Sequence, residues 1–533
     1  MLWAWELVRA VHLLIEKLVY GGDGLARLPA DEHGQGKAVF VPFVIPDEQV
    51  EASPVETRPG FVRGKLDKVL TPSPERIEPG CPYFQRCGGC HYQHINYDAQ
   101  LRYKAEILRE TLRRTAKLEL AQEIQIHPSQ PWNYRNRTRM VVRHTPEFTL
   151  GYYRHNSHDV LPVETCPISS PLINQAIAAL WKLGRDGAVP QSLHGFQFFA
   201  NHDDTKLLVE AYVWLDGQAN AVEAPDFSPA TRGSKASRAS APAKTGLKPG
   251  LKAPSKEAAF RRAELPQRVQ KRHSLGTPVA RRFHPIFIPM SGPQAHETLR
   301  MTDDIQPFAA ALHGALPQLA GVVVFPMSAF EDESRQHTPL TAIHPEASQA
   351  IGADSLMYHA VGHDYHVNGG SFFQTNRHLI DTLAQIVVAN RTGRGALDLY
   401  AGAGLFTAQL ARNFDTVLAV ESSPHSFDDL RRNVPSNVKC IRSTTENFLT
   451  ERAAKLAPDL VVVDPPRAGL GEKTAKALGR MTISRVTYVS CDPATLARDL
   501  RVLLEFNFRV EQAHLLDMFP QTFHMETVLH LAR

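Results

Sequence analysis

A single cysteine stands directly after one of the most apolar runs of the chain. Cys491 follows residues 485–490, Arg-Val-Thr-Tyr-Val-Ser, which have the composition of a strand buried on both faces. The thiolate of such a cysteine is a nucleophile that can form a covalent intermediate. Taken alone, a cysteine at a strand end is more often a buried structural residue, so its neighbours must decide between the two interpretations.

A glycine-rich turn at 397–404, Leu-Asp-Leu-Tyr-Ala-Gly-Ala-Gly, lies between a predicted strand and a predicted helix. Glycines there let a ligand approach the backbone closely, and ligands of open α/β sheets bind at the carboxyl ends of the strands. Glu421 ends the next predicted strand about 20 residues later, where a carboxylate can bind both hydroxyls of a ribose. The pattern predicts a nucleotide-cofactor site, although a dinucleotide site or a purely structural turn has the same outline.

Two details favour S-adenosylmethionine over a dinucleotide. The Ala-Gly-Ala-Gly turn lacks the longer Gly-x-Gly-x-x-Gly cradle for phosphates. A third predicted strand ends in Asp464-Pro465-Pro466-Arg467, a sequence familiar from nucleic-acid methyltransferases. Since the glycine turn, Asp464 and Cys491 each follow a predicted parallel strand, we expect them at one edge of the sheet.

A nucleophilic cysteine beside a methyl donor suits the methylation of carbon 5 of uracil, which is not nucleophilic enough to take a methyl group unaided. A thiolate that adds to carbon 6 generates an enolate, and carbon 5 can then attack the methyl sulfonium. A base must afterwards remove the carbon 5 proton so that the thiol can leave. The sequence therefore has to supply a carboxylate or a histidine near Cys491.

Four other cysteines form a second candidate site. Three of them have the spacing C-x5-C-x2-C and the fourth is distant: Cys81, Cys87, Cys90 and Cys166. Zinc usually takes two close pairs, so three cysteines plus one are more typical of iron–sulfur ligation. Unligated or oxidised thiols are the alternative.

The elements that must position these residues change in kind along the chain. Short strands with turns between them, such as 38–42 and 61–66, predict a small β-barrel near the start. A helix is expected at about 97–118, and mixed strands and helices follow. From about residue 385 strands and helices alternate, which predicts a parallel sheet flanked by helices.

Composition divides the chain of 533 residues further. The length suggests two to four domains, and no run of 18 apolar residues or signal-peptide pattern occurs, so neither membrane insertion nor export is expected. The net charge is +4, yet 228–282 alone holds 14 lysines and arginines against 2 acidic residues. We expect 226–283 to be a disordered basic insertion, with either a solubilising role or a non-specific attraction to RNA phosphates.

Taken together, these motifs resemble the RNA 5-methyluridine methyltransferases, especially those of 23S ribosomal RNA. The matching segments run in family order over nearly the whole chain except the basic insertion: 81–90, 166–168, 371–376, 397–404, 464–469, 490–499 and 517–527. The resemblance implies an N-terminal OB-like barrel of the TRAM type at 12–75, a central mixed α/β iron–sulfur and RNA-binding domain at 76–380, and a Rossmann-like class I methyltransferase domain at 381–533.

The resemblance also implies roles for individual residues. Cys491 matches the nucleophile, and Glu526 matches the base that takes the carbon 5 proton. The family's cofactor positions fall on Gln374, Tyr400, Glu421, Thr444 and Asp464, whereas Leu405 stands where relatives often carry asparagine. A 4Fe–4S cluster is implied on Cys81, Cys87, Cys90 and Cys166. Without the resemblance Glu526 could not be chosen over Glu505 or Glu511.

RNA is the expected partner, with 23S ribosomal RNA favoured over transfer RNA because the barrel and the cluster cysteines occur together. The segment 132–139 mixes aromatic residues with arginine, which suits stacking on unpaired bases and pairing with phosphates, although a solvated basic strand looks similar. The target uridine must leave its stack to reach the cysteine. We expect a cytoplasmic monomer. The alternatives are a transfer-RNA methyltransferase, a non-catalytic RNA-binding assembly factor, and a radical S-adenosylmethionine enzyme, whose expected cysteine spacing differs.

Overall fold

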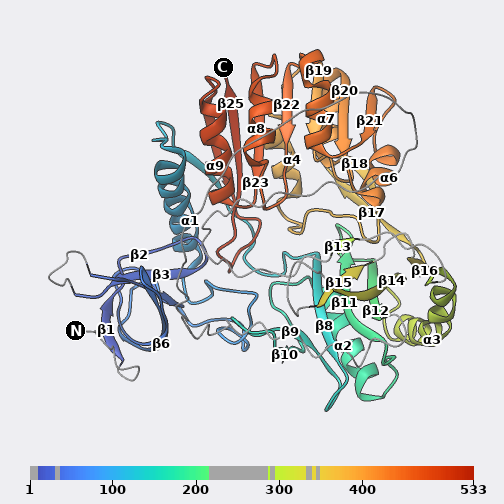
Figure 1. Ribbon diagram of the computed structural model, residues 1–533. Helices are drawn as coiled ribbons and strands as arrows, with labels where there is room; N and C mark the ends of the chain where they lie inside the picture. The colour runs from blue at the N-terminus through green and yellow to red at the C-terminus, as the bar shows by residue number, and fades with distance from the viewer. Residues whose placement is uncertain are drawn as a thin grey trace, which may run out of the picture. The chain divides into compact units, whose positions relative to one another are not determined.

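The computed structural model describes residues 10–29, 36–214, 286–287, 294–331, 339–343, 348–389 and 391–533. The described strands form sheets of six, nine and eight strands and one separate hairpin (Figure 1). The predicted basic insertion at 226–283 and the first nine residues lie outside the described residues. No helix in the described part of the chain combines the length and the apolar character needed to cross a lipid bilayer.

The six-stranded sheet lies at the N-terminal end and is curled into a small barrel. Its strands pair in the order β1-β5-β6-β4-β3-β2. The bounds are Val11–Leu14 (β1), Lys17–Leu18 (β2), Asp23–Arg27 (β3), Ala38–Pro42 (β4), Gln49–Thr57 (β5) and Phe61–Thr71 (β6). Because β1 and β2 are successive pieces of one bent stretch yet stand at opposite ends of this order, the sheet closes on itself. The barrel matches the short strands expected there, and its RNA-binding role stays a prediction.

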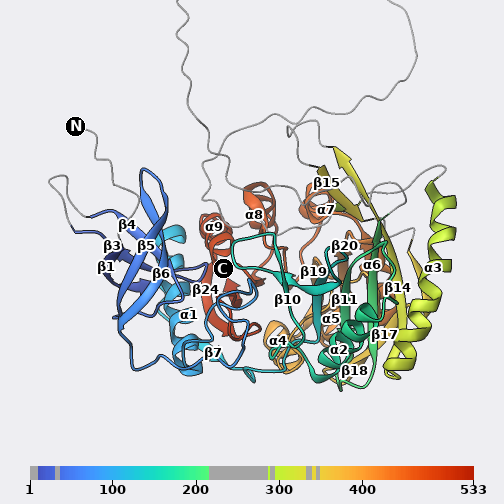
Figure 2. The same cartoon turned by 90° about the horizontal axis from the view of Figure 1, so that it is seen from below.

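The nine-stranded sheet belongs to the middle of the chain. Its main order is β10-β9-β8-β11-β12-β14-β15-β13, with β16 paired to β14. The bounds are Arg137–Arg143 (β8), Thr149–Tyr153 (β9), Val160–Pro162 (β10), Leu193–Ala200 (β11), Leu207–Trp214 (β12), Ile286–Phe287 (β13), Leu319–Glu331 (β14), Pro339–Ile343 (β15) and Gln349–Gly352 (β16). Helices α2 (Pro171–Arg185) and α3 (Gln294–Ala315) pack against it, α2 on β9 and β11 and α3 on β14 (Figure 2). The separate hairpin is β17 (Ser355–Ala360) and β18 (His363–Asn368).

The eight-stranded sheet carries the predicted chemistry. Its order is β21-β20-β19-β22-β23-β25-β24-β7. The bounds are Ile124–His127 (β7), Gly393–Leu399 (β19), Phe414–Glu421 (β20), Val438–Arg442 (β21), Leu460–Val463 (β22), Arg485–Ser490 (β23), Arg509–Leu516 (β24) and Glu526–Ala532 (β25). The first five strands of this order are parallel and β25 is antiparallel to both of its neighbours. This is the helix-flanked parallel sheet expected from the sequence, except that β25 runs antiparallel and β7 joins the far edge from outside 381–533.

Helices bury both faces of this sheet, and for that reason its central strand β22 is apolar at every position. The helices are α1 (Tyr97–Thr111), its π-helical continuation η1 (Leu112–Ala116), α4 (Ile380–Val388), α5 (Leu405–Asn413), α6 (Pro424–Asn433), α7 (Thr445–Arg452), the 3-10 turn η3 (Ala453–Lys455), α8 (Gly471–Gly479) and α9 (Pro493–Leu504). In β22, Val461 and Val463 belong to one core cluster while Leu460 and Val462 belong to another. Alternate residues of a strand point to opposite faces, so both cores need an apolar side chain.

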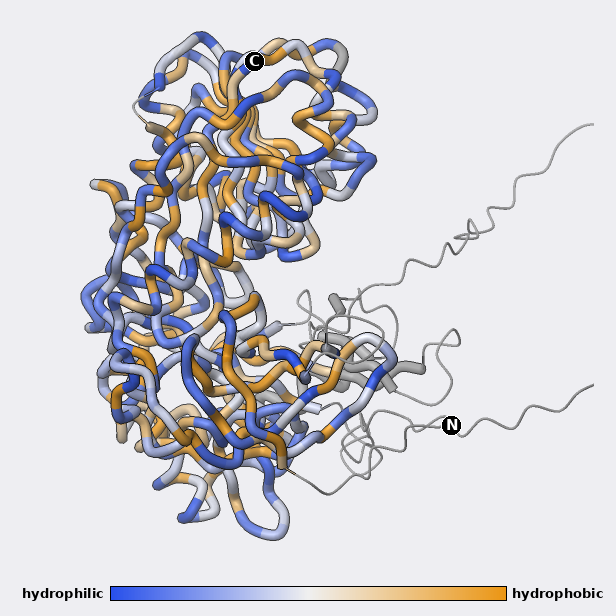
Figure 3. The backbone as a smooth tube through the Cα atoms, turned by 90° about the vertical axis from the view of Figure 1, so that its left-hand side faces the viewer, coloured by the Kyte–Doolittle hydropathy of each residue, from blue (hydrophilic) through white to orange (hydrophobic). Residues whose placement is uncertain are grey.

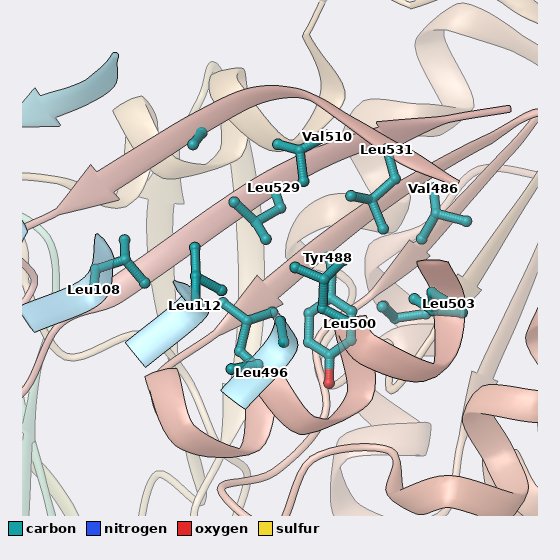
Figure 4. Close-up of a cluster of buried hydrophobic side chains, with 14 of the residues drawn as sticks. Leu108, Leu112, Val486, Tyr488, Leu496, Leu500, Leu503, Val510, Leu529 and Leu531 are labelled. Atoms are coloured by element: carbon teal, nitrogen blue, oxygen red, sulfur yellow. The ribbon is translucent and has the colours of Figure 1, made fainter. Parts of the chain in front are cut away.

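The first of these cores joins α1 and η1 to α9. Leu108 and Leu112 lie beside Leu496 and Leu500, over Tyr488 of β23 (Figure 4). Figure 3 shows apolar residues concentrated along the inner strands of the C-terminal sheet. Burial of a leucine of this kind contributes about 1.5–3 kcal/mol. A helix at 97–118 was expected, and the structure ends the regular part at Thr111 with a π-helical turn that continues to Ala116.

Candidate active site

Cys491 lies in the turn between β23 and α9, and hydrogen bonds of its neighbours hold that turn. Asp492 caps α9, because its Oδ1 accepts from the backbone N–H of Ala494 at 2.9 Å and of Thr495 at 3.0 Å. Ser490 Oγ accepts from the N–H of Asp492 at 3.2 Å. The thiol therefore sits half-buried at a fixed point just past the carboxyl end of β23.

Glu526 is brought to the same point by the reversed direction of β25. Ser490 pairs with Thr527, so one further step along the antiparallel register sets Cys491 opposite Glu526. The start of an antiparallel strand lies at the same sheet edge as the ends of its parallel neighbours. Glu526 is 4% exposed. The two predicted catalytic side chains are thus neighbours, although 35 residues of sequence separate them.

The carboxyl groups of Glu526 and Asp464 and the thiol of Cys491 share this edge with the guanidinium group of Arg467. Burial raises the pKa of Glu526 well above its ordinary value, the Asp464 carboxylate raises it further, and Arg467 opposes both effects. Burial also raises the pKa of Asp464. Burial raises the pKa of the Cys491 thiol to about 12, with a further rise from Glu526 and a counteracting pull from Arg467. A carboxylate whose proton affinity is raised in this way is well suited to act as a general base.

The glycine turn after β19 has the open backbone that a cofactor needs. Tyr400, Gly402 and Gly404 all have positive φ, of 65°, 57° and 93°. A Cβ placed on Gly402 meets no atom within 4 Å, so the space in front of it is free of protein. The Gly402 N–H donates to Glu421 Oε2 at 2.8 Å, and Oε1 accepts from the N–H of Ser423 at 2.7 Å. The Glu421 carboxylate is thereby fixed facing the turn.

The remaining predicted cofactor residues differ in their surroundings. Burial raises the pKa of the Tyr400 hydroxyl, and its hydrogen bond with Thr445 at the start of α7 opposes part of this rise. Thr444 caps α7, its hydroxyl accepting from the Asn447 N–H at 3.3 Å. Gln374 is 8% exposed and belongs to the segment 371–376. Asp464, the last of the predicted set, lies close enough to Glu526 to raise the pKa of that carboxyl.

Two buried side chains of this region were not singled out from the sequence. Asp398 is fully buried, accepts from Thr407 Oγ1 at 2.5 Å, and has its pKa raised by burial to about 7. His524 is 3% exposed, and its Nδ1 is 3.2 Å from Arg467 Nη2. Both residues lie inside motifs that the sequence does show, at 397–404 and 517–527. Their residue types gave no sign that they point inward.

The four cysteines of the predicted cluster are free thiols that act on one another electrostatically. Burial raises the pKa of Cys90 and of Cys87, and the neighbouring thiols raise both further. Burial also raises the pKa of Cys81, and the nearby Cys166 thiol adds to this rise. No group of three or more His, Cys, Asp or Glu side chains in the described residues is placed to hold a single metal ion. Four thiols are the donor set that an iron–sulfur cluster takes, and the cluster stays a prediction.

The predicted RNA-contacting segment at 132–139 is a partly buried loop whose last three residues begin β8. Tyr134 is fully buried, and its hydroxyl donates to the carbonyl of Pro520 at 3.1 Å. Arg137 is 7% exposed, lies over the Phe199 ring at 4.3 Å and pairs with Glu210 at 3.6 Å. The expectation that this whole segment meets RNA is therefore wrong for Tyr134 and Arg137, because both are used inside the protein. Arg139 remains half-exposed.

Comparison with known proteins agrees with this geometry. The family model described as tRNA (Uracil-5-)-methyltransferase matches residues 353–533, which include Glu421, Asp464, Cys491 and Glu526. Over this segment the chain is similar to the tRNA (uracil-5-)-methyltransferase family. The predicted resemblance is thus confirmed.

Relatives of this family cover almost the full chain. An uncharacterized RNA methyltransferase of Halalkalibacterium halodurans is 26% identical over 97% of this chain and 96% of its own. An uncharacterized RNA methyltransferase of Aquifex aeolicus is 27% identical over 98% of both chains. The similarity therefore includes the barrel and the middle sheet as well as the methyltransferase sheet.

A solved structure supports the fold over the same length. The tRNA (uracil-54, C5)-methyltransferase of Pyrococcus abyssi, in complex with S-adenosyl-L-homocysteine, is 20% identical and has a TM-score of 0.62. The match covers 98% of this chain and 99% of the Pyrococcus chain. At this level of identity the likeness shows the fold alone.

Proposed function

We propose that this protein transfers a methyl group from S-adenosylmethionine to carbon 5 of a uridine in RNA. The observation that carries the proposal is the placement of Cys491 opposite Glu526, at the sheet edge where Glu421 faces the open glycine turn. A nucleophile, a base and a ribose-binding carboxylate are the parts that this reaction requires.

The residues of the chain have separable tasks in the proposed reaction. When bound, S-adenosylmethionine supplies an electrophilic methyl group. The Cys491 thiol loses its proton to solvent, and Sγ then forms a bond to carbon 6 of the flipped uracil. The electrons of the double bond between carbons 5 and 6 move toward carbon 5, which becomes nucleophilic. After carbon 5 has taken the methyl group, Glu526 accepts the proton of carbon 5. The electrons of the broken C–H bond restore the ring double bond, and the bond between carbon 6 and Sγ breaks.

The protonation state of the site fits this order of events. The raised pKa of Cys491 means that the thiol keeps its proton until substrate binding changes its surroundings. Arg467 is the cation that favours the thiolate, since it counteracts the rise caused by burial and by Glu526. We assign to Arg467 the role of stabilising negative charge while the thiol is deprotonated. Glu421 would hold the ribose of the cofactor, with Tyr400, Gln374, Thr444 and Asp464 completing the proposed cofactor surroundings.

The thiols of Cys81, Cys87, Cys90 and Cys166 would hold a 4Fe–4S cluster. Such a cluster supplies structural cross-linking here, because methyl transfer involves no net oxidation or reduction. The loop that follows Cys90 contacts the loop that leads to Glu526: the N–H groups of His91 and Tyr92 donate to the Gln521 carbonyl at 2.9 and 3.0 Å. Ligation of Cys90 would therefore help to hold the segment that precedes Glu526, through the hydrogen bonds of its two neighbours in sequence.

The RNA substrate we favour is 23S ribosomal RNA, supported by the presence of both a barrel and cluster cysteines. The Pyrococcus neighbour acts on transfer RNA, which makes a transfer-RNA uridine the second candidate. An RNA substrate and free thiols fit the cytoplasmic location expected from the sequence, and a monomer stays a prediction.

Mapping of 5-methyluridine in the RNA of a strain lacking the gene tests this proposal. We expect loss of the mark at one or two ribosomal sites, restored by the intact gene and not by Cys491→Ala. Unchanged ribosomal RNA together with loss of a transfer-RNA mark would establish the second candidate. RNA with no altered uridine in either class would refute the methyltransferase proposal.

A further inference from the structure

The turn of the barrel between β2 and β3 reaches the catalytic turn. The Tyr20 hydroxyl donates to Asp492 Oδ2 at 3.2 Å and lies 3.5 Å from the carbonyl oxygen of Cys491. The other carboxylate oxygen of Asp492 is the cap of α9. One side chain of the barrel thus holds the residue that follows the nucleophile, across more than 470 positions of sequence.

The same turn packs against the loop that leads to Glu526. The Tyr20 ring meets the Phe523 ring edge-on, with centroids 5.4 Å apart. Gly22 has φ of 97°, and a Cβ placed there would come within 3.2 Å of His91 and 3.3 Å of Phe523. The glycine is needed both for its conformation and for the close approach. The turn at 21–24, Gly-Gly-Asp-Gly, therefore does more than connect two strands of the barrel, because it also packs against the loop that leads to Glu526.

Packing fixes this contact in place. Leu18 and Ile45 of the barrel are buried in the same core cluster as Met525, next to the base. The Phe523 ring in turn contacts the tilted ring of His524, whose Nδ1 lies near Arg467. Contacts therefore run from the barrel to both halves of the catalytic centre, the nucleophile turn and the base loop.

We infer that Tyr20 is a positioning residue of the methyltransferase, and that the barrel completes the catalytic centre in addition to any binding of RNA. The inference rests on the proposed function. Tyr20 acts through Asp492: its hydroxyl holds one carboxylate oxygen, steadies the turn that carries Cys491, and offsets part of the carboxylate's negative charge beside the thiol.

Electrostatics gives this role a measurable sign. Asp492 is one of the groups that raise the pKa of Cys491, together with burial, Glu526 and Asp464, while Arg467 lowers it. Removal of the Tyr20 hydroxyl leaves the Asp492 charge less compensated. The thiolate then becomes harder to form, so the pH at which Cys491 reacts must move upward.

The test compares the full-length protein with Tyr20→Phe in two measurements. The first is the rate at which iodoacetamide alkylates Cys491 as a function of pH, followed by mass spectrometry of the peptide that contains it, without RNA. The second is kcat and KM for methylation of the RNA substrate. For Tyr20→Phe we expect the alkylation profile to shift to higher pH and kcat to fall about ten-fold with little change in KM, the size expected for one hydrogen bond to a charged group.

Tyr103→Phe is the matched control. Its hydroxyl also donates to a carboxylate, that of Glu75, but on α1 away from Cys491. This variant should leave the alkylation profile and kcat unchanged. In addition, Tyr20→Phe should produce no further shift of the profile in an Asp492→Asn background, because the charge through which it acts is then absent.

An unchanged alkylation profile with unchanged kcat, or a change confined to KM, would overturn the positioning role. Because alkylation needs no RNA, its result judges Tyr20 even if no methylated uridine is found. If the wild-type protein transferred no methyl group but Tyr20→Phe still showed the expected alkylation shift, the proposed function would be refuted. The contact of Tyr20 with the cysteine turn would then stand by itself.

Discussion

Lys104 Nζ donates to Asp517 Oδ1 at 2.6 Å, and neither side chain has any exposed surface. Lys104 belongs to α1, whereas Asp517 opens the loop that runs from β24 to Glu526. Lys104 also donates to the carbonyl of Phe519 at 3.1 Å. Burial lowers the pKa of Lys104, and the nearby Asp517 carboxylate opposes this effect. The pair therefore fixes the loop before the base to a helix outside the predicted methyltransferase domain.

Removal of one partner of the Lys104–Asp517 pair should lower the stability of the protein. In Lys104→Met the Asp517 carboxylate stays buried without its cation, and we expect the free energy of unfolding to fall by about 3–5 kcal/mol. Urea denaturation measures it. The exposed pair of Lys182 and Asp186 is the control, since Lys182→Ala should cost less than about 1 kcal/mol. A loss below about 1 kcal/mol for Lys104→Met would show that the loop is held by its other contacts.

Glu526→Gln should separate thiol reactivity from turnover. The Glu526 carboxylate raises the pKa of Cys491, so its removal lowers that pKa and increases the thiolate fraction at a given pH. We therefore expect alkylation of Cys491 by iodoacetamide to become faster at pH 8 to 9, while methyl transfer falls at least about 100-fold for lack of a base. Arg467→Met should slow alkylation, because the cation that favours the thiolate is lost. Slower alkylation in Glu526→Gln would contradict the assigned geometry.

Glu421→Gln should weaken binding of the cofactor and leave the reactivity of Cys491 unchanged. In the proposed function its carboxylate, which accepts from Gly402 and faces the open turn, binds two ribose hydroxyls, and loss of its charge should weaken these two hydrogen bonds by about 1.5–3 kcal/mol together. Calorimetric titration with S-adenosylhomocysteine should then give a Kd raised at least about ten-fold. Cys491→Ala should bind the same ligand as tightly as the wild-type protein. Equal affinity for Glu421→Gln would place the ribose elsewhere.

The sequence sufficed wherever a local pattern decides the outcome. The apolar runs at 460–463 and 485–490 could only be strands covered on both faces, and parallel strands put Asp464 and Cys491 at one edge. The base could not be found in this way. Glu526 lies at that edge because β25 runs antiparallel, and a strand's direction depends on distant pairing that no local pattern records. Its choice over Glu505 and Glu511 rested on the family resemblance.

Non-local contacts explain the other omissions as well. β7 has four residues, of which only Ile124 is buried, so its place at the edge of the methyltransferase sheet has no apolar signature. Tyr20 reaches Asp492 through the docking of the barrel, which a turn motif cannot reveal. Arg137 and Tyr134 resemble RNA-contacting residues by type, and only the packed structure shows that Glu210, Phe199 and Pro520 occupy them.

Iron content tests the cysteine cluster. In protein reconstituted without oxygen, we expect about four irons per chain and the broad visible absorption of a 4Fe–4S cluster. Cys87→Ser should lose most of this iron, because Cys87 is one of the four thiols that act on one another electrostatically. Cys440→Ser is the matched control, since this half-buried cysteine lies on β21 in the methyltransferase sheet and should leave the iron unchanged.

Loss of the cluster should also loosen the contacts of His91 and Tyr92 with Gln521, so hydrogen exchange at 517–525 should quicken in Cys87→Ser alone. Full iron in Cys87→Ser would exclude this ligand set, and full iron loss with unchanged exchange at 517–525 would show that the cluster does not support the base loop.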